Sequence, residues 1–159
     1  MMIDYHSKYD EEIKNLLVEL QEHIMKIDKE HYNIVGENFK EEYFKKTMEE
    51  IEKYQGKMYL YQEDNKIIGL VVGLINNEEI DTYDFKAPKR GRISELVVSK
   101  KYRKQGYGKI LLQEMEDYLK SVGCMDILIG VFAYNNSAIH FYEMNGYHVR
   151  MMEMIKKDI

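Results

Sequence analysis

The sequence Arg-Lys-Gln-Gly-Tyr-Gly-Lys, residues 103–109, connects a strand-like stretch, residues 93–99, to an amphipathic helical one. The first N–H groups of a helix have no partner inside it, the helix dipole adds partial positive charge, and glycine allows close backbone approach. A strand, a glycine turn and a helix start therefore favour an anion-binding site, to which Arg103, Lys104 and Lys109 add charge. On these residues alone, a surface turn with solvated basic side chains is the alternative.

Neither common phosphate motif fits this turn. A P-loop needs four residues between its glycines and then Lys and Ser/Thr, whereas one residue separates Gly106 from Gly108 and Ile110 follows Lys109. A dinucleotide-binding fingerprint needs a glycine where Leu111 stands. The turn therefore predicts a different class of anionic ligand.

A second cluster lies about thirty residues further on. Asn135 or Asn136 is predicted to cap a short helix, because asparagine accepts hydrogen bonds from the first helical N–H groups. Ala138 leaves room for a close neighbour, and Tyr142 lies one turn later on the same face. Gly146 permits a left-handed exit. Taken alone, this cluster is equally an ordinary helix with a packed tyrosine.

The periodicity of the remaining chain predicts an α/β fold. Apolar residues at helical spacing predict two N-terminal helices, the first ending near residue 27 and the second running from about residue 38 to Gly56. Strand-like segments follow at residues 57–63, 67–75, 93–99, 126–132 and 147–155, with a polar loop at residues 76–91. Helices are expected after the basic turn, ending at Gly123, and at residues 137–144. This order predicts a mixed sheet with helices on its faces.

Composition excludes several classes of protein. The chain has 159 residues, 45% of them apolar, and no linker, so residues 1–159 are expected to form one domain. A net charge of −5 disfavours nucleic-acid binding, and the longest apolar run, nine residues, is too short to span a membrane. The lone Cys124 is expected to be a buried thiol, and the five dispersed histidines predict no metal site. With no visible signal peptide, the chain is expected to be cytoplasmic.

Together the two clusters resemble the GNAT superfamily of acetyl-CoA-dependent N-acetyltransferases. The family turn R/Q-x-x-G-x-G/A is matched by Arg103, Gly106 and Gly108. Its later motif N-x-x-A-x-x-x-Y-x-x-x-G-F/Y is matched by Asn135, Ala138, Tyr142, Gly146 and Tyr147. The frequent pattern E-L-x-V stands at Glu95, Leu96 and Val98. The resemblance covers about residues 92–149.

The resemblance implies a site for acetyl-CoA. The turn beginning at Arg103 would hold the pyrophosphate of CoA through the backbone N–H groups of Lys104, Gln105, Gly106, Tyr107, Gly108 and Lys109. The strand segment Leu96, Val97 and Val98 would pair with the pantetheine arm like an added strand, and the Leu96 N–H would polarise the thioester carbonyl. Asn135 would contact the pantetheine or a nearby water, Ala138 would face the cofactor, and Tyr142 would lie near the sulfur.

The same resemblance implies transfer of an acetyl group to a primary amine of a small molecule or peptide. Such an amine has a pKa of about 10.4 and needs a base to remove its proton, while a phenol can protonate the departing thiolate. Tyr142 is the candidate acid and Glu95 the candidate base, although Glu95 is equally a charge partner for Arg92 or Lys100. Less favoured candidate bases are Glu79, Asp81, Asp84, His23 and His31.

The fold expected from this resemblance is a mixed, mostly antiparallel sheet of six to seven strands with helices on both faces. A central parallel pair, residues 93–99 and 126–132, would splay to admit the cofactor. The alternatives are a catalytically silent acyl-CoA-binding sensor or scaffold, and an acetyltransferase acting on protein N-termini or lysines. A homodimer is possible, and no membrane or nucleic-acid partner is expected.

Overall fold

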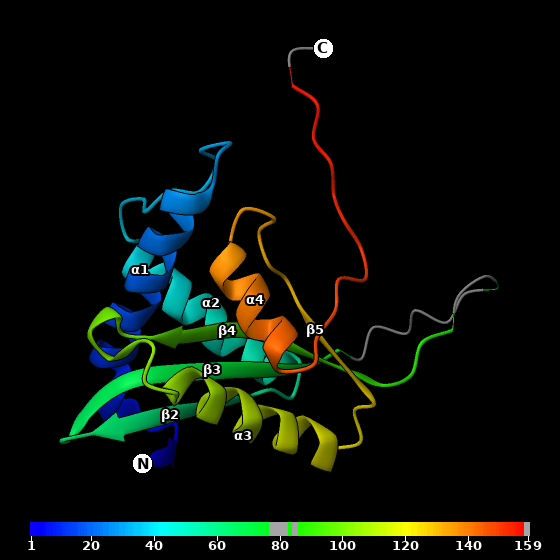
Figure 1. Ribbon diagram of the computed structural model, residues 1–159. Coiled ribbons are helices and arrows are strands. Elements are labelled where there is room, and N and C mark those ends of the chain that lie inside the picture. The colour runs from blue at the N-terminus through cyan, green and yellow to red at the C-terminus, as the bar shows by residue number, and fades with distance from the viewer. Residues whose placement is uncertain (77–82, 84–85, 158–159) are drawn as a thin grey trace.

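The computed structural model describes residues 1–76, 83 and 86–157, which form a mixed sheet with helices on both faces (Figure 1). The sheet order is β1-β2-β3-β4-β5, and only β4 and β5 run parallel. The strands are β1 (Met2–Asp4), β2 (Lys57–Glu63), β3 (Lys66–Asn76), β4 (Arg90–Val98) and β5 (Asp126–Ile129). The helices are α1 (Asp10–Ile27), α2 (Phe39–Lys53), α3 (Tyr107–Ser121) and α4 (Asn136–Met144). Short 3-10 turns cover Ser7–Tyr9 and Lys100–Tyr102.

The expected number of strands, six to seven, is wrong, because the described residues form a five-stranded sheet. The strand expected at residues 147–155 has the composition of a strand but pairs with no other strand of the described chain. The strand expected at residues 126–132 ends at Ile129, and the three-residue β1 was not predicted at all. Most of the loop expected at residues 76–91 lies outside the described residues, and β4 already begins at Arg90.

Two apolar cores lie on opposite faces of the sheet. The α1-side core joins α1 to alternate residues of β2, β3 and β4, such as Leu60, Leu70 and Val97. The α3-side core joins α3 to the intervening residues, such as Val71 and Ile93, and contains the buried Cys124. Burial of these alternating residues on both faces is the main favourable term that holds the helices to the sheet. The prediction that Cys124 is buried is confirmed.

Glycines allow α3 to lie close to the sheet. A Cβ at Gly73 would come within 2.2 Å of the Met115 sulfur, and one at Gly91 within 2.7 Å of the Leu119 side chain. A Cβ at either position would displace the Met115 or Leu119 side chain. The two glycines therefore leave room for these buried side chains of α3 against the sheet.

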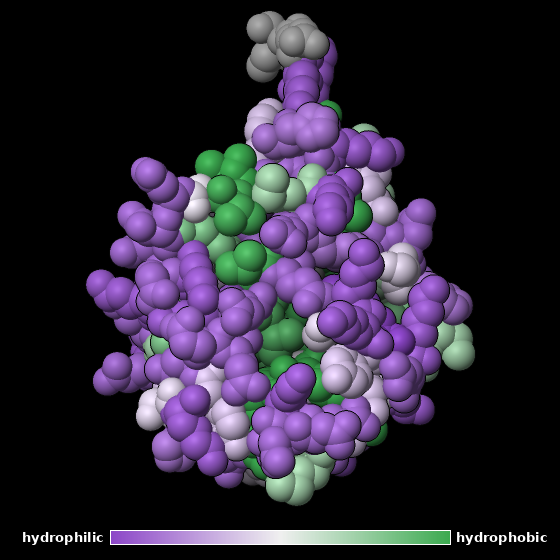
Figure 2. All heavy atoms as spheres, turned by 90° about the vertical axis from the view of Figure 1, so that its left-hand side faces the viewer, coloured by the Kyte–Doolittle hydropathy of each residue, from purple (hydrophilic) through white to green (hydrophobic). Residues whose placement is uncertain are grey.

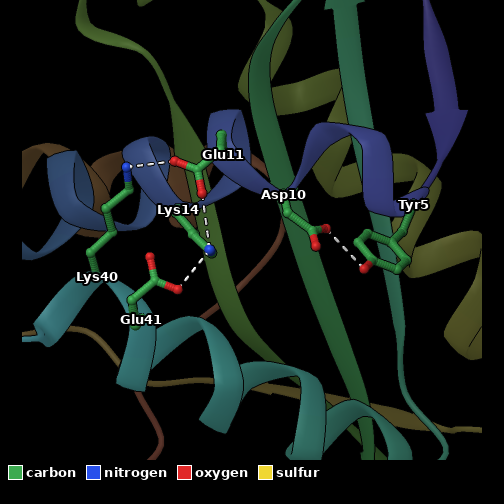
Figure 3. A network of polar contacts seen from close by, with 6 residues as sticks. All are labelled: Tyr5, Asp10, Glu11, Lys14, Lys40 and Glu41. Atoms are coloured by element: carbon green, nitrogen blue, oxygen red, sulfur yellow. Dashed lines mark hydrogen bonds and ion pairs between the residues drawn. The ribbon is translucent and has the colours of Figure 1, made fainter.

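Ion pairs connect α1 to α2 at the surface. Lys14 lies between Glu11 and Glu41, at 3.0 and 2.7 Å, and Lys40 pairs with Glu11 at 2.9 Å (Figure 3). Both glutamates are largely exposed, so these pairs contribute little to the free energy of unfolding. These ion pairs favour one relative orientation of α1 and α2, while the apolar sides of the two helices contribute most of the free energy of unfolding.

Strand β4 carries a β-bulge at Ser94. Val72 lies opposite Glu95 whereas the next residue of β3, Gly73, lies opposite Ile93, so β4 has one extra residue here. The side chains of a regular strand alternate between faces, and the extra residue reverses that alternation. Ile93 accordingly packs in the α3-side core, while Glu95 is directed toward α2.

Candidate active site

The edge of β4 opens where its pairing with β5 stops. β5 pairs with β4 only from Arg90 to Ile93, so residues 94–98 of β4 have β3 on one side and no described strand on the other. The N–H of Ser99 donates to the carbonyl of Ile68 in β3, at 2.8 Å. Because neighbouring residues direct their N–H groups to opposite edges, those of Leu96 and Val98 point toward the open edge, and that of Val97 points toward β3.

The turn before α3 presents a row of unpaired backbone donors. Lys104 and Gly106 adopt positive φ angles of 62° and 92°. The first N–H group to donate within the helix is that of Lys109, to the Gly106 carbonyl at 3.0 Å. Among the described residues, no acceptor is found for the N–H groups of residues 104–108. Left-handed geometry at Gly106 is natural only for glycine, which explains its place in the turn. The start of α3 is therefore rich in free backbone donors, the feature that an anion site requires.

The side chain of Arg103 is directed away from these donors. Its Nε donates to the Val98 carbonyl at 2.8 Å, and its Nη2 pairs with Glu19 of α1 at 3.1 Å. Glu19 also accepts hydrogen bonds from the Ser99 hydroxyl and the Lys100 amide. Arg103 therefore joins the end of β4 to the turn and α1, and Glu19 compensates its charge. No sequence spacing pointed to Glu19, because the contact spans more than eighty residues.

The remaining residues of the turn divide between structural contacts and solvent. The Tyr107 hydroxyl donates to Glu63 at 2.7 Å, and this bond together with burial raises the pKa of Tyr107 to about 12. Gln105 donates to the Lys101 carbonyl at 3.4 Å. Lys104 and Lys109 are exposed, so they are the basic side chains of the turn that remain available to an anion.

Helix α4 begins as the sequence predicts. Asn135 caps it, with its side-chain oxygen accepting the N–H of Ala138 at 3.2 Å. Tyr142 lies one turn after Ala138, and its ring is edge-on to those of Phe141 and Tyr147. Burial and, to a smaller extent, the nearby charge of Glu95 raise the pKa of Tyr142 to about 12. Within the described chain, no hydrogen-bond partner is found for its hydroxyl.

Glu95 is a buried carboxylate with one hydrogen-bond donor. It is 8% exposed, and the Tyr43 hydroxyl donates to its Oε1 at 2.7 Å. The pKa of Glu95 is raised to about 7, chiefly by burial. The nearby Glu50 also raises this pKa, whereas the hydrogen bond from Tyr43 and the charge of Lys46 lower it. The prediction that Glu95 and Leu96 lie on opposite faces is confirmed. In the described structure Glu95 forms no ion pair with Arg92 or Lys100.

Tyr43, on α2, is a site residue that the sequence did not reveal. Its ring stacks on Phe39 at 4.9 Å, and burial and the adjacent Glu95 both raise the pKa of its hydroxyl. The hydroxyl therefore stays protonated and remains a donor to Glu95. Tyr43 lies 52 residues from Glu95 in a helix with many polar residues, so no local pattern marks it.

Of the other candidate bases, only His23 and His31 lie in the described part of the chain. His23 lies on α1, where burial and the neighbouring Arg103 lower its pKa. His31 lies in the segment after α1 and has a positive φ of 58°. Glu79, Asp81 and Asp84 lie outside the described residues.

The described residues form neither a metal-ligand cluster nor a membrane-spanning helix. Within residues 1–76, 83 and 86–157 no group of three His, Cys, Asp or Glu side chains converges as metal ligands would. No described helix is long and apolar enough to cross a bilayer. A groove between α1 and α2 is lined by Phe44, Met48, Ile51 and charged residues, and does not include Glu95 or Tyr142. The face of the molecule nearest α1 is mostly hydrophilic, with hydrophobic atoms visible between the charged side chains (Figure 2).

Comparison with known proteins defines the class of this site. The model of the acetyltransferase (GNAT) family matches residues 22–147, which include β4, the turn, α3, β5 and α4. The chain belongs to the GNAT acetyltransferase family. No curated protein sequence matches it.

Solved structures share the fold over almost the whole chain. The F44R mutant of the BH1408 protein from Bacillus halodurans is 18% identical, covers 100% of this chain and 99% of its own, and has a TM-score of 0.86. A putative acetyl transferase from Pyrococcus furiosus is 26% identical, covers 99% of each chain, and has a TM-score of 0.72. Glucosamine-6-phosphate N-acetyltransferase from Arabidopsis thaliana is 21% identical, covers 98% of this chain and 96% of its own, and has a TM-score of 0.65.

Proposed function

We propose that this protein transfers the acetyl group of acetyl-CoA to a primary amine of a small molecule or peptide. The proposal rests on how the open edge of β4, the turn before α3 and the side chains of Glu95 and Tyr142 are arranged. The open edge of β4 leads directly into a turn with five free backbone donors, and Glu95 and Tyr142 lie close enough to influence each other electrostatically. Membership of the GNAT family supports the same chemistry.

The residues present fit acetyl-CoA. The N–H groups of residues 104–108, at the positive end of α3, suit its pyrophosphate, and Lys104 and Lys109 add formal charge. The free N–H groups of Leu96 and Val98 suit the pantetheine arm as an added strand. The Val98 carbonyl already accepts from Arg103, so the donors at this edge are more available than its acceptors.

Glu95 is proposed to accept the proton of the amine, directly or through water. With a pKa of about 7, half of its carboxylates are ionised near neutral pH, while the amine with a pKa of about 10.4 is mostly an ammonium ion. A base with a pKa near the working pH is the most effective for this transfer. The amine nitrogen then forms a bond to the acetyl carbon.

Tyr142 is proposed to donate the proton that the CoA thiolate takes as the carbon–sulfur bond breaks. A pKa of about 12 keeps its hydroxyl protonated, and the absence of a described hydrogen-bond partner leaves that proton available. The N–H of Leu96 would stabilise the negative charge that develops on the carbonyl oxygen between these steps. The ammonium ion loses two protons as the amide forms, of which Glu95 accepts one and solvent takes the other, while the CoA thiolate gains a proton from Tyr142, which solvent then reprotonates.

The acceptor is proposed to be a cationic or aromatic amine. The region around α2 is rich in acidic and tyrosine side chains, including Glu41, Glu42 and Tyr43, which would attract positive charge. One structural neighbour, glucosamine-6-phosphate N-acetyltransferase, is named for a small amine acceptor, and this chain shares its fold.

The test is a panel of small amines and lysine peptides, assayed for CoA release, combined with acetyl-CoA binding measured by thermal shift. We expect turnover of at least one small amine and a raised melting temperature with acetyl-CoA. Gly108→Asp should abolish the thermal shift, because a carboxylate would occupy the anion site. Gly108→Ala is the matched control, since its Cβ would lie 3.6 Å from Phe141, an ordinary contact.

Three outcomes would contradict parts of the proposal. A wild-type protein without a thermal shift at millimolar acetyl-CoA would exclude the cofactor site. Binding without turnover of any amine would favour the sensor or scaffold. Turnover of lysine peptides alone would favour a protein acetyltransferase.

A further inference from the structure

Glu19 of α1 contacts the link that joins β4 to the turn before α3. This link, residues 99–103, passes beside α1 (Figure 1). The Glu19 carboxylate accepts hydrogen bonds from the Ser99 hydroxyl at 3.2 Å, from the N–H of Lys100, and from Nη2 of Arg103 at 3.1 Å. One carboxylate therefore fastens both ends of the link to α1.

Helix α1 gives Glu19 a fixed support. Leu16 and Leu17, in the preceding turn of the helix, are 4% and 1% exposed and belong to the α1-side core. A side chain can position its neighbours only if its own backbone is held, and these buried residues meet that requirement. The contacts of Glu19 therefore relate the link to the body of the molecule.

The turn before α3 depends on such a constraint because its backbone is strained. Lys104 has a φ of 62°, a conformation that residues other than glycine keep only where surrounding contacts enforce it. Arg103, the residue before it, is held from two sides, since its Nε donates to the Val98 carbonyl at 2.8 Å and its Nη2 donates to Glu19. These contacts fix the direction in which the chain enters Lys104, and with it the directions of the N–H groups that follow.

The charge of Glu19 does not explain its place beside this turn. A carboxylate near an anion site repels the ligand. Its ion pair with Arg103 contributes little to the free energy of unfolding, because the two side chains are 30% and 35% exposed. The conformation that the Glu19 contacts impose on the turn explains them better.

We propose that Glu19 is a positioning residue for acetyl-CoA. Through the link it holds the turn so that the N–H groups of residues 104–108 face the pyrophosphate. Arg103 acts through the same contacts and does not bind the phosphate itself, which is left to the backbone donors and to Lys104 and Lys109. The inference rests on the proposed function, which supplies acetyl-CoA as the ligand.

The first experiment measures the dissociation constant of acetyl-CoA by isothermal titration calorimetry for the full-length wild type and three variants. Glu19→Ala removes every contact to the link and should weaken binding about tenfold, because the turn must then be ordered when the ligand binds. Glu19→Gln keeps an oxygen acceptor in the same place and should bind within about threefold of the wild type.

Glu22→Ala is the charge-matched control. Glu22 is exposed one turn further along α1 and forms no ion pair within the described part of the chain. The variant loses the same charge from the same helix and keeps the contacts to the link. It should bind acetyl-CoA at least as tightly as the wild type.

Two further measurements separate positioning from a loss of the fold. For an amine that the wild type acetylates, the KM for acetyl-CoA should rise in Glu19→Ala while kcat stays near the wild-type value, because Glu95 and Tyr142 are unchanged. Without acetyl-CoA, the Lys100 amide should exchange hydrogen faster in Glu19→Ala than in the wild type, whereas the Met115 amide inside α3 should not change.

The sign of the change in affinity decides the outcome. A Glu19→Ala protein that binds acetyl-CoA as tightly as the wild type, or more tightly, would overturn the inference, since Glu19 would then act only through its charge or not at all. Equal losses in Glu19→Ala and Glu19→Gln would also overturn it, because the placed oxygen would have no effect. A wild type that binds no acetyl-CoA would instead overturn the proposed function, and the inference with it.

Discussion

Helices α3 and α4 lie on the same side of the sheet, but they differ in what they bury. α3 places four side chains, at Leu111, Leu112, Met115 and Leu119, in the core with at most 1% exposure. α4 buries none of its residues completely, and its Met144 is 73% exposed. α3 is held by the chain itself, whereas α4 and β5 have apolar surface that no described part of the chain covers. Buried side chains of α3 support the turn that is proposed to bind acetyl-CoA, whereas α4 carries Tyr142 on a less buried helix.

The largest expected effect tests this difference in stability. Leu119→Ala removes buried apolar atoms against Gly91 and should lower the free energy of unfolding by about 2–5 kcal/mol. Met144→Ala, the matched change on α4, should alter it by less than about 0.5 kcal/mol. Urea denaturation of both variants measures the contrast. Equal losses would show that α4 is packed as tightly as α3.

A second test concerns the base on β4, between the two helices. Glu95→Gln keeps the size of the side chain and removes its basicity, so turnover should fall by about 10²-fold or more. If the carboxylate acts as the base, as proposed, the wild-type rate should rise with pH through about 7, and this acidic limb should disappear in the variant. Acetyl-CoA affinity should stay near the wild-type value. An unchanged pH–rate profile would return Glu95 to a purely structural role.

The third test addresses α4 directly. Tyr142→Phe keeps the ring and its contacts with Phe141 and Tyr147 but removes the hydroxyl, which matters mainly in the transition state. Turnover should fall by about 10²-fold, the low end for a general acid, because water can partly replace it. The melting temperature and acetyl-CoA binding should hardly change. A variant with full turnover would remove Tyr142 from the mechanism.

The smallest effect is expected from Tyr43→Phe. The Tyr43 hydroxyl donates to Glu95 and so stabilises the carboxylate, which lowers the pKa of Glu95. Its removal should raise that pKa and move the acidic limb of the pH–rate profile to higher pH, with a loss of less than about tenfold at the plateau. A merely structural role would lower the rate at every pH and leave the limb in place. Tyr142→Phe is the control, since it should lower the rate and leave this limb where it is.

The sequence predicted those features that depend on local spacing. The cap at Asn135, the glycine turn at residues 103–109 and the parallel pair of β4 and β5 follow from patterns within a few dozen residues. Tyr43 and Glu19 escaped prediction because their contacts join residues more than fifty positions apart. The number of strands was overestimated because the pattern of residues 147–155 shows that they can form a strand, and cannot show that a partner strand is present.

The bulge at Ser94 makes the site depend on the number of residues in β4 as well as on their identity. Before it, odd-numbered side chains face α3, and after it they face α1 and α2. Side chains of a strand alternate between the two faces of the sheet, so one extra residue moves every later side chain to the opposite face. A substitution at one position of β4 changes one contact. Loss of the bulge with no residue removed would instead direct the Glu95 carboxylate to the α3 face and turn the N–H of Val97 to the open edge in place of that of Leu96.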